Sequence, residues 1–80
     1  MKPRALGQPR YAYPAHTQTV VNTLMDACTI AGDRAPRGSH RRRACFRCAA
    51  ALGAIARGEA EPASIESTLA EARALTGALL

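Results

Sequence analysis

Residues 39–58 read SHRRRACFRCAAALGAIARG, and this stretch decides the fold class. Ser39 suits the N-cap of a helix and Gly58 suits the position after its last turn. The sequence therefore predicts a helix over residues 39–57. Its apolar residues recur every three or four positions, as on one face of a helix: Cys45, Cys48, Leu52 and Ile55.

A helix on each side of this stretch completes the predicted fold. The first covers residues 17–31, with Thr17 as N-cap and Gly32 after the last turn, and the other covers residues 62–79 and opens at Pro62. No segment reads as a strand, so we expect an all-α three-helix bundle. The two outer stripes are Val20, Val21, Leu24, Cys28 and Ala31, then Ile65, Leu69, Ala72, Thr76 and Leu79, with Leu75 alongside.

Residues 1–14 have a different character, with three prolines, two tyrosines and no apolar period. Proline lacks the backbone N–H and restricts the residue before it, so this segment predicts an extended N-terminal arm. A chain of 80 residues allows one small domain, which we place at residues 15–80.

The predicted core is thin. Alanine supplies 18 residues, whereas Leu, Ile, Val and Phe together supply 13. The central helix also carries a second apolar strip, formed by Phe46, Ala50 and Gly53. We expect a second copy of the chain or an obligate partner to cover it, so that dimerisation completes the bundle. The alternative is that the two outer helices cover one strip each.

The charge of the chain is asymmetric around its net value of +5. Residues 1–58 hold ten of the eleven basic residues, with Asp26 and Asp33 as their acids, which gives +8. Residues 59–80 hold four glutamates and Arg73, which gives −3. Such asymmetry predicts a basic surface for an anionic partner, either nucleic acid or an acidic protein.

An arginine cluster over residues 34–47 carries this prediction. Three of its arginines fall in the first turn of the central helix, where the helix dipole is already positive and cations are unfavourable. Because three consecutive residues are unfavourable at this helix N-terminus, we infer that they serve a function. We expect an acidic protein partner, with apolar anchoring by the aromatic residues. Phosphates of a nucleic acid and a solvated charge run are the alternatives. The candidate partner-binding residues are Arg37, Arg41, Arg42, Arg43, Arg47, Phe46, Tyr11 and Tyr13.

The three cysteines invite a metal or redox interpretation because two of them form a CxxC motif. Cys28 and His40 could complete a four-ligand zinc set with Cys45 and Cys48, but the spacing matches no familiar zinc module. The cysteines instead fall on the predicted core stripes, where a thiol acts as a small apolar group. We therefore expect buried free thiols, no metal and no cofactor.

The sequence contains no catalytic constellation, so we expect a binding protein and not an enzyme. No apolar run approaches the length of about 20 residues that a membrane span needs. Together with the odd number of cysteines, this predicts a cytoplasmic protein with reduced thiols. The sequence thus predicts a small regulator, adaptor or inhibitor, and the alanine-rich, arginine-rich composition suits a bacterial or bacteriophage source.

Overall fold

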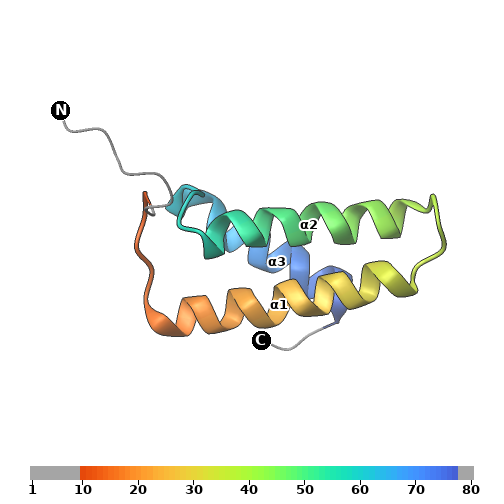
Figure 1. Ribbon diagram of the computed structural model, residues 1–80, viewed down its shortest axis with the longest axis horizontal. Helices are drawn as coiled ribbons and strands as arrows, with labels where there is room; N and C mark the ends of the chain where they lie inside the picture. Colours follow the sequence, from red (N-terminus) through yellow and green to blue (C-terminus); the bar gives the residue numbers. More distant parts are fainter. Residues whose placement is uncertain (1–9, 78–80) are drawn as a thin grey trace.

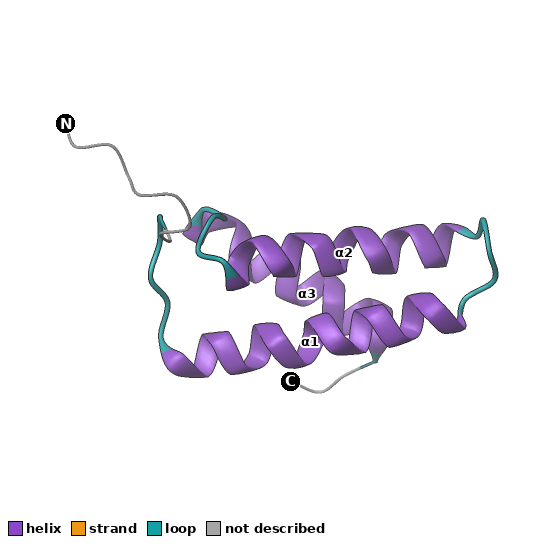
Figure 2. Ribbon diagram, in the orientation of Figure 1, coloured by secondary structure: helices purple, strands orange, loops and turns teal. Residues whose placement is uncertain are grey.

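A computed structural model describes residues 10–77 and shows three helices with no strand among them (Figures 1 and 2). Helix α1 spans Ala15–Arg34, α2 spans His40–Ala56 and α3 spans Ile65–Thr76, with a short 3₁₀ turn, η1, at Pro62–Ser64. Helices α1 and α2 lie side by side and antiparallel, and α3 packs across both of them (Figure 1). The predicted all-α three-helix fold is confirmed.

The core forms where the three predicted stripes meet. All four stripe residues of α2 are buried, as are Val21, Leu24 and Cys28 of α1 and Ile65, Leu69 and Ala72 of α3. Val20, Ala31, Leu75 and Thr76 are half-buried at the edges. No nitrogen or oxygen atom of a buried side chain in residues 10–77 lacks a hydrogen-bond partner. The apolar periodicity therefore identified the inward faces.

The ends of the helices follow the local sequence at some positions and tertiary packing at others. The Oγ of Ser39 accepts a hydrogen bond from the backbone N–H of Arg42 at 3.1 Å, so the predicted N-cap of α2 is confirmed. Gly58 follows α2 with φ 71°, and Gly77 ends α3 with φ 71°, a left-handed conformation that glycine adopts without strain. The predicted third helix was therefore too long, and Leu79 lies outside the described residues.

The prediction for α1 was wrong at both ends. The helix begins at Ala15, with Pro14 as N-cap, so Thr17 lies inside its first turn. It continues past Gly32 to Arg34, so Gly32 does not end the helix. Gly32 instead lies where another residue packs closely against α1. A Cβ atom on Gly32 would lie 3.0 Å from the Phe46 ring. The missing side chain thus lets the ring approach the backbone of α1.

The same contact answers how the second apolar strip of α2 is covered. Phe46 packs against Gly32 of α1, and Gly53 is buried with the Met25 sulfur 3.7 Å from the position of a Cβ atom. Ala50 is exposed. The chain therefore covers most of this strip itself, and the homodimer stays a prediction.

The segment before α1 is attached to the far end of α2. The backbone N–H groups of Arg10 and Tyr11 both donate to the carbonyl oxygen of Gly58, at 2.9 and 2.8 Å. The hydroxyl of Tyr13 donates to the carbonyl oxygen of Ala60. Residues 10–14 therefore pack on their own chain, whereas residues 1–9 of the predicted arm lie outside the described residues.

The two helical glycines give a matched test of this packing. We expect Gly32→Ala to lower the free energy of unfolding by about 1–2 kcal/mol, because the methyl group would push on Phe46 and outweigh the gain in helix propensity. We expect Gly53→Ala to raise the free energy of unfolding by up to about 1 kcal/mol. The nearest atom to a Cβ at this position, 3.2 Å away, belongs to the flexible guanidinium end of Arg57, which can move aside. Urea denaturation of both variants measures the difference. Equal effects of the two substitutions would contradict the close approach at Gly32.

Candidate functional site

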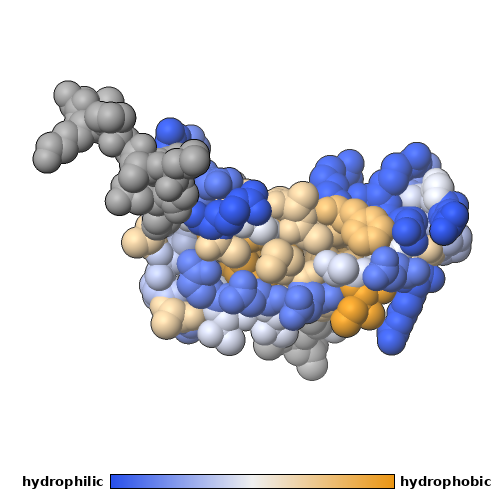
Figure 3. Space-filling view, in the orientation of Figure 1, coloured by the Kyte–Doolittle hydropathy of each residue, from blue (hydrophilic) through white to orange (hydrophobic). Residues whose placement is uncertain are grey.

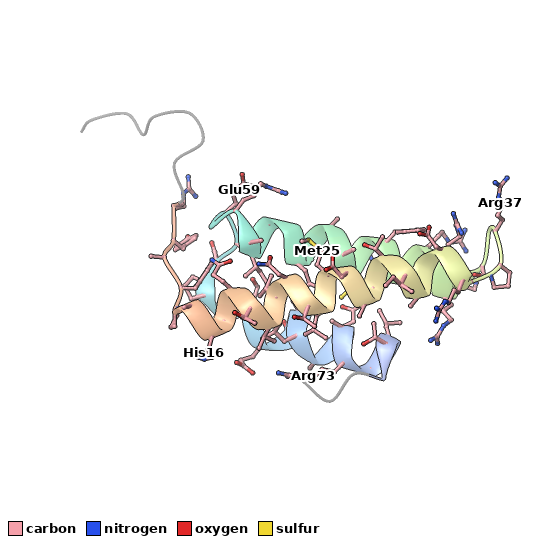
Figure 4. The ribbon with its side chains drawn as sticks, turned by 60° about the horizontal axis from the view of Figure 1, so that its bottom comes forward. His16, Met25, Arg37, Glu59 and Arg73 are labelled. Atoms are coloured by element: carbon pink, nitrogen blue, oxygen red, sulfur yellow. The ribbon has the colours of Figure 1, made fainter. Side chains whose placement is uncertain are left out.

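The arginines of the cluster gather at one end of the molecule, around the loop that joins α1 to α2. We call this surface the basic end, formed by Arg34, Arg37, Arg41, Arg42, Arg43 and Arg47. Figure 3 shows hydrophilic side chains concentrated there beside hydrophobic surface, and Figure 4 shows Arg37 at the extreme of the molecule. Asp33 is the one acid that adjoins these residues in the sequence.

Arg42 is bound within the molecule. Its Nη1 donates to the carbonyl oxygens of Gly32 and Ala35, at 3.1 and 3.5 Å. Its guanidinium carbon also lies 5.0 Å from the centroid of the Phe46 ring, within the range of a cation–π interaction. One arginine thus satisfies carbonyls at the end of α1 and covers the ring that packs against α1.

Arg41 has the same relation to α3. Its Nη2 donates to the carbonyl oxygen of Leu75 at 2.8 Å, in the last turn of that helix. The C-terminal ends of helices carry negative partial charge, where cations are favourable. Two of the three arginines at the N-terminus of α2 therefore break a local rule because their guanidinium groups reach the ends of two other helices.

The other arginines of the basic end project from the surface. Arg34, Arg37, Arg43 and Arg47 are all exposed. Arg43 donates to Nδ1 of His40 at 3.1 Å, one turn earlier on the same face of α2. Arg47 continues that face by one more turn. These four cations are placed to meet a partner without giving up a contact in the core.

The three aromatic residues that we expected to anchor a partner make contacts within the chain instead. Phe46 is half-buried between Gly32 and Arg42. Tyr11 and Tyr13 lie beyond the other end of α2, about 25 Å from its N-terminus at 1.5 Å per residue. Burial raises the pKa of Tyr13, and the neighbouring Tyr11 adds to the effect. The structure therefore does not bring the tyrosines and the arginines into one surface.

Beside the arginines lies a feature that sequence reasoning missed. An open groove of about 580 Å³ runs between the end of α1 and the end of α3. Ile30 borders it with 51% of its surface exposed, the one large hydrophobic residue so exposed among residues 10–77. Ile30 follows Cys28 by two positions, which places it on the opposite side of α1 from the core stripe. This offset from the core stripe was the signal in the sequence that could have identified Ile30 as an exposed apolar residue.

The cysteines lie in the core, as predicted. Cys28, Cys45 and Cys48 are free thiols with at most 2% of their surface exposed. His40 is exposed at the start of α2, so the candidate zinc set is not assembled. Within residues 10–77, no three His, Cys, Asp or Glu side chains are grouped to hold a metal ion.

Burial also sets the acidity of two thiols. Burial, with a smaller contribution from the nearby Cys28, raises the pKa of Cys48 to about 12. Burial raises the pKa of Cys28 as well, while its interaction with the Cys48 thiol acts in the opposite direction. Both groups are protonated at neutral pH, and a thiol without thiolate character is a poor nucleophile.

No protein-family model, curated protein or solved structure matches this sequence. Within the described residues, none of the helices has both the length and the apolar character of a membrane span.

The thiols predict how stability depends on pH. Above about pH 9 the unfolded chain loses the Cys48 proton while the folded chain retains it until about pH 12. The folded state then binds more protons, so the free energy of unfolding falls as the pH rises through this interval. With thiols kept reduced, we expect Cys48→Ala to flatten this fall by up to about 1.4 kcal/mol per pH unit. Urea denaturation from pH 7 to 11 measures the slope.

Ser67→Ala, at an exposed position on α3, is the control and should keep the wild-type slope. A Cys48→Ala variant whose stability falls as steeply as that of the wild type would contradict the buried, protonated thiol.

Proposed function

We propose that this protein binds an acidic surface of another protein stoichiometrically, as a small cytoplasmic regulator, adaptor or inhibitor. One observation carries the proposal: exposed arginines and a partly apolar groove, which Arg34 and Arg41 line, lie at a single end of the molecule. Apolar contact and cations side by side suit a protein interface, whose core is apolar and whose rim is polar. In such an interface the arginines contribute association rate and specificity more than affinity.

Three features favour a protein partner over a nucleic acid. The Ile30 groove offers apolar area that phosphates do not use. The Phe46 ring, covered by Arg42, is not free to stack on a base. Helices α1 and α2 lie antiparallel (Figure 1), whereas the helices of a helix-turn-helix cross at about 90–120°.

A pair of matched variants tests the proposal. Arg43→Ala/Arg47→Ala removes two exposed cations from the basic end, and Arg10→Ala/Arg57→Ala removes two from the opposite end. We expect affinity purification with the wild type to identify a partner that binds 1:1 by calorimetry. The first variant should weaken this complex about tenfold and slow its association, whereas the second should leave it within about twofold.

The alternative is tested by fluorescence anisotropy with duplex DNA and single-stranded RNA between about 50 and 300 mM salt. Phosphate neutralisation gives a slope near −0.9 for each contact in a plot of log affinity against log salt. Micromolar binding with a slope of four or more contacts, abolished by Arg43→Ala/Arg47→Ala, would contradict the protein-binding proposal and favour a nucleic-acid-binding regulator.

A further inference from the structure

The groove at the basic end has an apolar floor and a cation on each wall. Ala27, Ile30 and Ala31 line it from α1, Pro36 lines it from the following loop, and Thr76 marks the α3 side. Arg34 and Arg41 stand beside these residues. A volume of about 580 Å³ lies within the range of ligand-binding clefts, so side chains of a partner can enter it.

Two other hollows among residues 10–77 are lined by different residues. Both are lined by the tyrosine segment, in which Tyr13 is hydrogen-bonded to the chain's own backbone. The groove at the basic end is instead bordered by Ile30, a large aliphatic side chain that is half exposed.

The electrostatics of the groove favour an anionic occupant. The C-terminal ends of α1 and α3 both border this groove, and the negative partial charge of a helix C-terminus would repel a carboxylate. Arg42 donates to Gly32 and Ala35, and Arg41 donates to Leu75, so cations already neutralise both ends. A guanidinium has five N–H donors, and Arg41 spends one of its nitrogens on Leu75. Arg34 adds an exposed fork of donors suited to a carboxylate.

Asp33 restricts the direction from which an acid can approach. At 100° per residue, Arg34 lies about 40° to one side of Ile30 and Asp33 about 60° to the other. Ala27 and Ala31 lie on the Arg34 side, which is the side of the groove. A carboxylate therefore finds attraction inside the groove and repulsion at its outer edge.

We propose that this groove binds a short acidic segment of the partner protein, with an aliphatic side chain against Ile30 and a carboxylate between Arg34 and Arg41. The inference rests on the proposed function and specifies the chemistry that the partner presents.

Selection from a random 12-residue peptide library on the full-length protein tests the groove. We expect the enriched peptides to combine Asp or Glu with Leu, Ile, Val, Met or Phe. For a selected peptide in about 50 mM salt, Ile30→Ser should weaken binding at least tenfold and Arg34→Ala about threefold to tenfold. Arg10→Ala, with the same loss of charge at the opposite end of the molecule, should change binding less than twofold, and Asp33→Ala should leave it unchanged or stronger.

Several results would contradict the proposal that the groove binds an acidic segment. These are a library without enrichment, enriched peptides without acids, or acidic peptides indifferent to Ile30→Ser and Arg34→Ala. Binding at least tenfold tighter in a chain ending at Gly77 would assign the groove to residues 78–80. Self-association abolished by Ile30→Ser would assign it to a second copy.

The two proposals fail separately. If the purified partner is lost from Arg43→Ala/Arg47→Ala but retained by Ile30→Ser, the protein-binding function stands and the groove proposal fails. If the partner is indifferent both to Arg43→Ala/Arg47→Ala and to Ile30→Ser, the function at the basic end fails.

Discussion

The contact among Gly32, Phe46 and Arg42 is the constraint on which the rest of the structure depends. The buried core of residues 10–77 combines six Leu, Ile and Val side chains with three cysteines and two alanines, so it has few large side chains to fix how two helices meet. Here the one phenylalanine of the chain packs where α1 lacks a side chain, and the guanidinium of Arg42 covers it while holding the last carbonyls of α1. Backbone, ring and cation together fix α1 against α2 at the end where the loop joins them.

The arginine cluster divides into two groups with different roles, one that holds helix ends and one that is exposed. Arg41 and Arg42 hold the ends of α3 and α1, so the N-terminus of α2 is crowded with cations for a structural reason. The exposed arginines are thereby presented from a fixed surface beside the Ile30 groove. A rigid presentation reduces the conformational entropy that a partner interface would otherwise lose on binding.

The sequence predicted what depends on local pattern and missed what depends on distant contacts. The stripe from Cys45 to Ile55, the Ser39 cap and the burial of the cysteines follow from periodicity and short-range chemistry, and all are confirmed. Gly32 was misread as a terminator because its partner, Phe46, is 14 positions away. Arg41 and Arg42 could not be separated from their neighbours, since the carbonyls that they reach belong to other helices.

A double-mutant cycle between Arg42 and Phe46 tests this central claim most directly. The free energies of unfolding of Arg42→Ala, Phe46→Leu and the double variant would be measured by urea denaturation. We expect a coupling of about 1 kcal/mol or more between Arg42 and Phe46, whereas Arg43→Ala with Phe46→Leu should be additive within about 0.5 kcal/mol. Additivity in the Arg42 cycle would show that the guanidinium is only a surface charge and would contradict the account.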